Sequence, residues 1–274
     1  MQERHRNRAV YFQELATTSQ KYFIPYIKRF KPLSRNSHIL EVGCGDGGNL
    51  LPFAVQGCHT VGVDIASCRI RDAREFFKNN KARGMFIASD LFGLTRLHGW
   101  ADVIIVHDVI EHICYKRRLL GKLCQLLARN GVIFMSFPAW QMPFGGHQQI
   151  CANWFISHLP FVHLLPTSIY RRLLWLAGES EGCICELMSI KKTRTPIELF
   201  EETVQEIPGL RIIDRTLWLV NPHYETKFGL RPRVLPEWIS QIPHIRNVLT
   251  TSCFYLLMAD QDRDCLTLQG VNRL

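Results

Sequence analysis

The chain has 274 residues, 47% of them hydrophobic and 21% charged, with a formal net charge of +9. This composition excludes an intrinsically disordered chain, and the length suits one large domain or one domain with a substantial insertion. No run approaches the roughly 18 apolar residues of a membrane span, and the first residues lack a signal-peptide core. We therefore expect a cytoplasmic protein without a transmembrane segment. The ten cysteines show no repeated metal-ligand spacing, so we expect free thiols and no metal site.

The first 36 residues form a basic N-terminal arm, with eight lysines and arginines against two glutamates. Apolar residues from Val10 to Phe30 recur at mostly helical spacing, and Pro32 ends the segment. We predict a helical arm over residues 1–36. Its charge could attract nucleic acid, an anionic membrane or an acidic substrate. Because aromatic and basic residues do not interleave as base stacking requires, a solvated helix face is the favoured interpretation.

Residues 38–49 read as a short apolar strand, a glycine-rich turn and the start of a helix. Such a turn lets a ligand approach backbone N–H groups at a helix N-terminus. One template for this ligand is a dinucleotide. Gly43, Gly45 and Gly48 satisfy the dinucleotide fingerprint, and Asp64 ends the next apolar run, where a ribose-binding acid is expected.

A second template uses Gly43, Gly45 and Gly47, preceded by Glu41 two residues upstream. An acid at this position suits a ligand that carries an ammonium and a sulfonium, and it would repel a pyrophosphate. We therefore favour a positively charged ligand.

From residue 37 onward, near-continuous apolar strands alternate with helical segments, which predicts a parallel sheet covered on both faces. Ligands of such sheets bind outside the carboxyl ends of the strands, next to the first strand. The five predicted strands of this region cover residues 39–42, 59–64, 85–89, 102–106 and 131–136.

Ionisable residues follow these strands at their carboxyl ends. Asp64 could accept both hydroxyls of a ribose, or it could simply form a turn. Asp90 follows the third strand, and His107 and His112 follow the fourth. Each of these two histidines could either contact a ligand or serve only in packing. Asp108 and Glu111 have the spacing of a capping box, so we predict that they begin a helix running to Leu127.

Three motifs in this order resemble the class I S-adenosylmethionine (SAM) methyltransferases. They are the acid-preceded glycine turn, the Glu111-His112 pair after the fourth strand, and the turn from Leu127 to Val132, in which Asn130 replaces a glycine. The resemblance covers about residues 37–137. It implies an α/β fold, a doubly wound, seven-stranded, mostly parallel sheet of the Rossmann-like methyltransferase type. Predicted strands at 210–220 and 251–258 would form its antiparallel edge.

The resemblance also implies which residues bind SAM. Glu41, the glycine turn and His107 would hold the methionine end, Asp64 the ribose, and Asp90 with Leu91 the adenine. The complete set of expected cofactor-binding residues is Glu41, Gly43, Cys44, Gly45, Gly47, Asp64, Ile65, Asp90, Leu91 and His107.

Two segments of the predicted domain, residues 37–274, lie outside the resemblance: an insertion at about 138–195 and a second at about 221–250. The first begins with a Gly-Gly-His-Gln run, residues 145–148, that resembles one in a subset of bacterial methyltransferases. Histidine titrates near neutrality, so His147 is our candidate general base or substrate anchor, with His112 as a second. A structural role for either histidine remains open. The long apolar stretch that follows predicts a helical lid.

The sequence thus predicts an enzyme that transfers the SAM methyl group to an oxygen, nitrogen or carbon nucleophile of a small molecule, which the apolar lid would allow to be lipophilic. Three alternatives stay open. The basic arm could serve methylation of RNA or protein, the glycine turn could serve an NAD-dependent oxidoreductase, and the protein could bind SAM without turnover.

Overall fold

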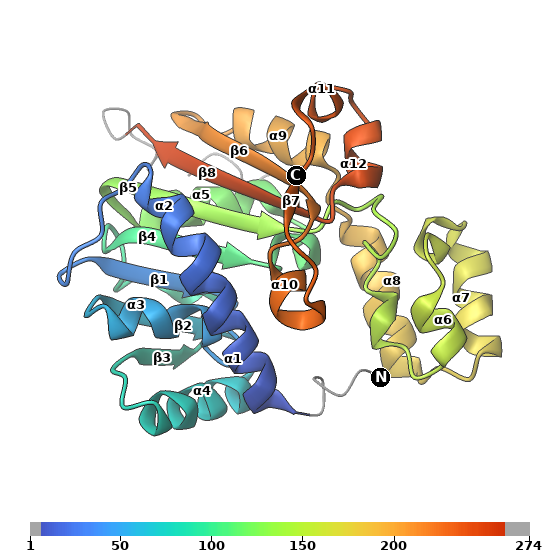
Figure 1. The fold of residues 1–274 in the computed structure, drawn as a ribbon, viewed down its shortest axis with the longest axis horizontal. Helices are drawn as coiled ribbons and strands as arrows, with labels where there is room; N and C mark the ends of the chain where they lie inside the picture. Colours follow the sequence, from blue (N-terminus) through green and yellow to red (C-terminus); the bar gives the residue numbers. More distant parts are fainter. Residues whose placement is uncertain (1–6, 261–274) are drawn as a thin grey trace.

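A computed structural model describes residues 7–260. Its centre is one eight-stranded sheet in the order β3-β2-β1-β4-β5-β8-β6-β7 (Figure 1). The five strands predicted first are all present and pair in parallel, while β8, β6 and β7 are antiparallel to their neighbours. The strands are β1 (His38–Val42), β2 (His59–Asp64), β3 (Met85–Ala88), β4 (Ala101–His107), β5 (Leu127–Phe137), β6 (Leu210–Val220), β7 (Arg233–Val234) and β8 (Ser252–Ala259).

The doubly wound, mostly parallel architecture is therefore confirmed, with one difference in strand number. The eighth strand is β7, which consists of Arg233 and Val234 and pairs with the outer edge of β6. Both of its residues are exposed, so this strand has no apolar alternation from which it could be predicted. Strand β5 begins at Leu127, four residues before the predicted start, and Asn130 within it has a φ of 60°. Asparagine tolerates this left-handed conformation, as expected at this turn.

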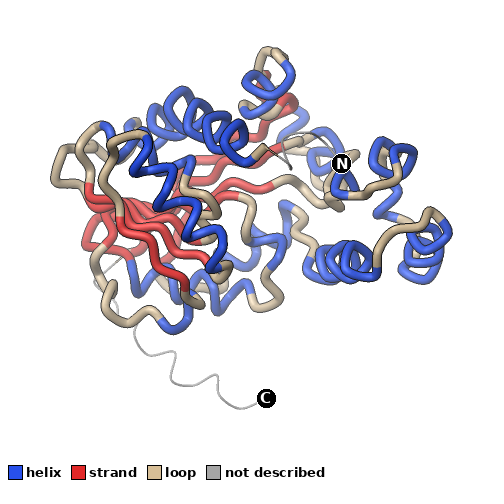
Figure 2. The backbone as a smooth tube through the Cα atoms, turned by 90° about the horizontal axis from the view of Figure 1, so that it is seen from below, coloured by secondary structure: helices blue, strands red, loops and turns tan. Residues whose placement is uncertain are grey.

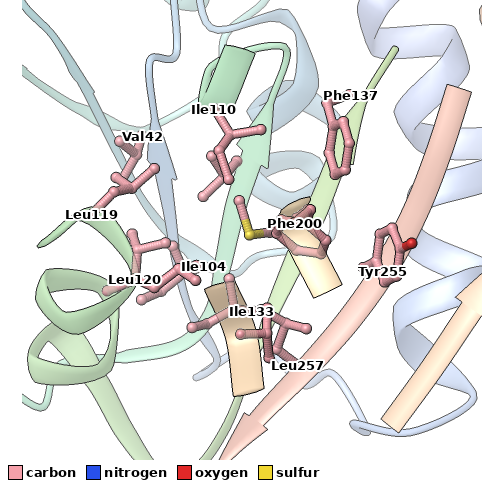
Figure 3. Packing of buried hydrophobic residues seen from close by; sticks show 14 of the residues in the cluster. Val42, Ile104, Ile110, Leu119, Leu120, Ile133, Phe137, Phe200, Tyr255 and Leu257 are labelled. Atoms are coloured by element: carbon pink, nitrogen blue, oxygen red, sulfur yellow. The ribbon is translucent and has the colours of Figure 1, made fainter. Parts of the chain in front are cut away.

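Helices cover both faces of the sheet (Figure 2). On one face α5 and α9 pack on alternate side chains of the central strands, among them Ile104, Ile133 and Leu257 (Figure 3). The other face is covered by the N-terminal arm with α3 and α4. These elements are α1 (Arg8–Thr18), a π-helical stretch (Ser19–Phe23), α2 (Ile24–Lys28), α3 (Leu51–Val55), α4 (Ser67–Asn79), α5 (Lys116–Leu126) and α9 (Ile197–Gln205).

The two variable segments lie at the carboxyl ends of the strands (Figure 1). Residues 138–195, here called the insertion, form a helical unit with a small apolar core of its own. Within residues 7–260, no helix is both long and apolar enough to cross a membrane. The helices of the insertion are α6 (Trp154–His158), α7 (Thr167–Leu176) and α8 (Glu181–Thr193); those of the second segment are α10 (His223–Phe228), α11 (Glu237–Ser240) and α12 (Ile245–Leu249).

Helical segments cover residues 8–28 of the predicted arm, whose residues 1–6 lie outside the described part of the chain, and Phe12 anchors these helices to the domain. The Phe12 ring is 1% exposed and stacks on Phe76 of α4 with a centroid separation of 4.8 Å. The ring of Phe77 meets the same side chain edge-on at 6.4 Å. The arm thus contributes to the central core.

We predict that Phe12→Ala lowers the free energy of unfolding by about 3–5 kcal/mol, because it removes a buried ring and leaves a cavity. Val10 lies on the same helix and is 46% exposed, so Val10→Ala should change the free energy by no more than about 0.5 kcal/mol. Urea denaturation of the two variants measures both values. Equal, small effects would mean that the arm does not unfold with the sheet.

Candidate active site

The glycine turn after β1 is held by the end of β2. The N–H groups of Gly43 and Cys44 donate to the carbonyl of Val63 at 2.8 and 3.0 Å. The Asp64 carboxylate accepts from the Gly45 N–H at 2.9 Å and from the Ala66 N–H at 2.8 Å. Both Asp64 oxygens are therefore oriented by backbone donors, and each retains a second lone pair that could accept from a ligand hydroxyl.

The turn also packs tightly against the segment that follows β4. Gly43 has a φ of +70°, and a Cβ atom at this position would lie 2.4 Å from Cγ2 of Val109. Real carbon atoms do not approach so closely, so only glycine lets the two backbone segments meet here. This contact brings the ends of β1 and β4 together.

Glu41 lies under the turn and is 1% exposed. Its Oε1 accepts from the Asn49 side chain at 2.7 Å, while Oε2 is buried without a hydrogen-bond partner. Burial raises the pKa of Glu41 to about 8, against the opposing effect of the Asn49 hydrogen bond. An unpartnered, buried carboxyl oxygen beside a glycine turn is suited to a cationic ligand, whose charge would stabilise the ionised form.

The N-terminal arm closes over the same turn. Arg8 of α1 forms an ion pair with the buried carboxylate of Asp46, which also binds Arg69 of α4 at 3.2 Å. A Cβ atom at Gly48 would lie 2.6 Å from the backbone oxygen of Phe12. The arm therefore rests directly on the turn and fixes its position.

The other expected cofactor residues occupy different environments. Ile65 is 80% exposed beside Asp64, whereas Cys44 is buried with the core. Asp90 caps the short helical turn Leu91–Gly93 by accepting from the Phe92 N–H at 2.9 Å. The Leu91 side chain is buried in the core under the sheet, so little of it faces solvent.

His107 is the last residue of β4, and its side chain contacts the N-terminal arm. Its ring meets Phe23 edge-on at 5.2 Å, and its Nε2 lies 3.4 Å from the Asp108 carboxylate. Its Nδ1 is buried and has no hydrogen-bond partner. This nitrogen is thus available to a ligand at the glycine turn.

His112 and His147, the two histidines expected to act on the substrate, lie side by side although they are 35 positions apart in the sequence. Their rings meet edge-on with a centroid separation of 5.3 Å. The carboxyl group of Glu111 lies beneath both, with its Oε1 3.7 Å from Nε2 of His147 and 4.0 Å from Nε2 of His112. Glu111, His112 and His147 are here called the acid-histidine cluster. Glu111 lies two positions after Val109, the residue that contacts the glycine turn.

Burial keeps this cluster uncharged at rest. Glu111 is 2% exposed and neither of its carboxyl oxygens has a hydrogen-bond partner. Burial, with a smaller contribution from the charge of Asp108, holds the pKa of Glu111 well above its usual range. Burial also lowers the pKa of His112, and it lowers the pKa of His147 to about 4. A neutral imidazole with a free nitrogen can accept a proton.

The predicted capping box at Asp108 and Glu111 is wrong. Asp108 adopts a φ of +52°, and the helical turn that follows, Ile110–His112, has Val109 at its N-cap without a side-chain cap. The longer helix α5 begins only at Lys116. Glu111 is therefore the site residue that the sequence did not reveal, since its spacing from Asp108 had a sufficient explanation in capping.

The Gly-Gly-His-Gln run has a packing explanation. A Cβ atom at Gly146 would lie 2.2 Å from Cβ of His163. His147 has a φ of 58°, and the amide of Gln148 donates to the carbonyls of Pro143 and Leu159 at 3.0 and 3.1 Å. These contacts fold the start of the insertion back on itself, which points His147 at Glu111.

Comparison with known proteins identifies a family. A protein-family model described as a methyltransferase domain matches residues 12–178. An uncharacterized methyltransferase of Mycolicibacterium gilvum is 28% identical over 115 residues, which are 42% of this chain and 44% of that protein. The ubiquinone biosynthesis O-methyltransferase of Rickettsia canadensis is 31% identical over 98 residues, 36% of this chain and 41% of that protein. The chain thus spans less than half the length of these curated relatives.

Solved structures share the fold over most of the chain. The plantazolicin methyltransferase BpumL, in complex with a pentazolic desmethylPZN analog and SAH, superimposes with a TM-score of 0.59 at 14% identity. That match covers 94% of this chain and 89% of BpumL. PKMT2 from Rickettsia typhi, in complex with AdoHcy, has a TM-score of 0.53 at 19% identity and covers 89% of this chain and 54% of that protein. At these identities the likeness concerns the fold.

The close approach at Gly43 gives a test of the turn. Gly43→Ala combines the cost of a positive φ, about 1–2 kcal/mol, with that of a Cβ atom placed against Val109, about 1–3 kcal/mol. Gly178 has a φ of +77°, and a Cβ atom there would meet nothing within 4 Å, so Gly178→Ala should show only the first cost. Thermal and urea denaturation compare the two variants. A Gly43→Ala protein as stable as Gly178→Ala would contradict the tight contact between the turn and Val109.

Proposed function

The chain belongs to the class I SAM-dependent methyltransferases, and from this we propose that it transfers the SAM methyl group to an oxygen, nitrogen or carbon nucleophile of a small molecule. SAM brings its own reactive methyl group on a positively charged sulfur. The protein has to hold the acceptor in line with that methyl group, exclude water and take up a proton where the nucleophile carries one. The observation that carries the proposal is the acid-histidine cluster beside the glycine turn.

The residues of the turn suit this cofactor. The unpartnered Oε2 of Glu41 and the unpartnered Nδ1 of His107 would receive polar groups of the methionine end. Asp64, already oriented by two backbone donors, would bind the ribose hydroxyls. Ile65, exposed next to Asp64, offers an apolar surface to the base.

The acid-histidine cluster would serve the acceptor. His147 is neutral at physiological pH because burial lowers its pKa to about 4, so its free ring nitrogen can take the proton of an acceptor O–H or N–H as the bond to the methyl carbon forms. The resulting imidazolium would lie 3.7 Å from the Glu111 carboxyl oxygen, and Glu111 would stabilise this charge by giving its own proton to His112, 4.0 Å away. His112, whose ring is 40% exposed, could pass the proton to solvent.

The insertion supports an acceptor with an apolar part. Helices α6 and α7 expose large apolar side chains; Trp154, Phe155, Ile169, Trp175 and Leu176 are 54–72% exposed. We propose that the insertion acts as a lid over a lipophilic acceptor. The relative that acts in ubiquinone biosynthesis is in keeping with an acceptor of this kind.

The basic arm gives little support to an RNA or protein acceptor. Arg8 is paired with Asp46 and Asp72, and Lys21 with Glu225. Two more arm cations, Arg29 and Lys31, lie 3.6 and 3.3 Å from acids of the sheet. Within the described part of the arm, these charges bind the domain itself. An NAD-dependent reaction is disfavoured because a pyrophosphate would bring no positive charge to the buried Glu41 carboxyl group.

Cofactor binding should release protons through Glu41. At pH 7 this carboxyl is mostly protonated, since its pKa is about 8, and an ammonium partner requires the ionised form. We predict that binding of S-adenosylhomocysteine at pH 7 releases close to one proton per chain, measured by calorimetry in buffers of different ionisation enthalpy. Glu41→Gln should abolish the release and weaken binding by about 1.5–3 kcal/mol. The exposed Glu75 on α4 is the matched control, and Glu75→Gln should behave as wild type. Proton release that persists in Glu41→Gln would exclude this role.

The proposed transfer is tested with methyl-labelled SAM and a whole lysate of bacterial cells, which is afterwards separated into low-molecular-weight, RNA and protein fractions. We expect the label in the fraction soluble in organic solvent, and a rate lowered about 10²- to 10⁴-fold by His147→Ala. His158, a histidine of the insertion that bonds only within its own helix, provides the control, and His158→Ala should keep the wild-type rate. Label in precipitated RNA or protein would favour the macromolecular alternative. No transfer to any fraction, with cofactor bound, would favour a module that binds SAM without turnover.

A further inference from the structure

The core of the insertion contains a second cluster of reactive side chains, apart from the acid-histidine cluster. Cys151, Glu179 and Cys183 place two sulfur atoms and a carboxylate oxygen within 4.8 Å of one another. Cys151 and Glu179 are buried, and Cys183 is half-buried. The proposed methyl transfer uses none of them.

Three separate segments bring these side chains together. Cys151 precedes α6, Glu179 lies in the turn between α7 and α8, and Cys183 stands in the first turn of α8. The Glu179 carboxylate is fixed by two backbone donors, the N–H of Ala152 at 3.1 Å and that of Asn153 at 2.8 Å. Carboxylates that bind metal ions are commonly oriented by such hydrogen bonds.

A second, independent observation at this cluster concerns the hydroxyl group of Tyr170. Its side chain is 0% exposed, and its hydroxyl has no hydrogen-bond partner. Burial raises the pKa of this hydroxyl, and the charges of Cys151, Cys183 and Glu179 raise it further, so the hydroxyl lies within electrostatic reach of all three. A buried, unpartnered hydroxyl costs about 1–3 kcal/mol, which an occupant of the cluster would recover.

We propose that Cys151, Cys183 and Glu179 bind one Zn²⁺ ion inside the insertion. Two thiolates and a carboxylate are ligands that zinc prefers, and tetrahedral Zn–S and Zn–O bonds of about 2.0–2.3 Å place the ligand atoms of one ion roughly 3.3–3.8 Å apart. The observed spacing of at most 4.8 Å would close to this range by small side-chain rotations. The fourth position takes a water molecule, and the Tyr170 hydroxyl donates to a bound thiolate. Both thiols lose their protons on binding, so each ion bound releases two protons.

A cation fits this cluster better than a disulfide between Cys151 and Cys183. The buried Glu179 carboxylate lies within 4.8 Å of both sulfur atoms. A cation neutralises the negative charges that this environment penalises. A disulfide would need an oxidant and would leave the Tyr170 hydroxyl without a charged acceptor.

The insertion also has a physical need for a metal ion. Its separate core contains seven buried residues, namely Cys151, Ile156, Val162, Tyr170, Leu174, Ile184 and Leu187. Small units with so little apolar burial are commonly stabilised by a metal or a disulfide. An ion joining Cys151 to the α7–α8 turn would hold all three helices of the insertion together.

The experiment uses Co²⁺ in place of Zn²⁺, because the absorption spectrum of bound Co²⁺ shows which kinds of ligand hold it. Protein stripped with a chelator under reducing conditions is titrated with Co²⁺ alone and with Zn²⁺ alone. We expect one ion per chain, thiolate-to-cobalt charge-transfer absorption, visible bands of tetrahedral cobalt, and two protons released per ion. Excess Zn²⁺ should displace the cobalt and remove the absorption.

Variants assign the ligands. Cys151→Ser and Cys183→Ser should each remove the charge-transfer absorption, and Tyr170→Phe should weaken zinc binding about tenfold. Cys185 is exposed two positions from Cys183, so Cys185→Ser is the matched control and should keep the full signal. The double variant His112→Ala, His147→Ala should keep it too, because it changes only the acid-histidine cluster. If a cysteine variant fails to fold, the wild-type cobalt spectrum decides by itself.

Three results would overturn the proposal. The first is the absence of thiolate absorption in the wild-type protein. The second is a charge-transfer signal that survives Cys151→Ser and Cys183→Ser. The third is a Cys151–Cys183 disulfide in protein purified without reductant, seen by mass spectrometry as a cross-linked peptide that persists with zinc present. None of these results bears on methyl transfer, which is measured separately.

Discussion

The site depends on one close contact, the meeting of Gly43 with Val109. The end of β2 holds the glycine turn from one side through Asp64, and the segment after β4 presses on it from the other. Since β2, β1 and β4 are neighbours in the sheet, the parallel arrangement brings their carboxyl ends to one edge. The absence of a side chain at Gly43 allows them to touch. The cofactor side and the acceptor side of the proposed reaction would therefore adjoin at this contact.

Two buried carboxyl groups lie near the contact of Gly43 with Val109, and burial determines the charge of each. Glu41 lies on the turn side and Glu111 on the side of the histidines, each with at least one oxygen that has no hydrogen-bond partner. Such a group stays protonated until a positive charge arrives beside it. For Glu41 the expected charge is the ammonium of the cofactor, and for Glu111 it is an imidazolium formed when a proton leaves the acceptor. In both places the carboxyl group stays neutral until the ligand or the reaction supplies a positive charge beside it.

The sequence predicts most of this arrangement, because strand ends can be read from apolar runs. The five parallel strands, the glycine turn and the residues after each strand follow from alternation and spacing. The contact between His112 and His147 could not be predicted in this way, because the position of His147 depends on how the insertion folds back after β5. The place of Glu111 beneath the two histidines was missed, because its three-residue spacing from Asp108 is also that of a helix cap. The positive φ of Asp108 shows that this residue does not cap a helix here. The cluster of Cys151, Glu179 and Cys183 could not be seen either, since its members are joined by the fold of the insertion and not by any local spacing.

The charge of the arm illustrates how composition can mislead. The arm is strongly basic, yet Arg8, Lys21 and Lys31 each lie within 4 Å of an acid on the domain. Partly exposed ion pairs of this kind contribute at most about 1 kcal/mol each, so they do not hold the arm in place. Burial of the rings of Phe12 and Phe23 supplies far more, at about 1.5–3 kcal/mol for each side chain. The ion pairs instead favour one register of the arm on the glycine turn, because a shift of one helical position would leave the buried Asp46 carboxylate with Arg69 alone. The arm cations Arg8, Lys21, Arg29 and Lys31 thus pair with acids of the domain itself.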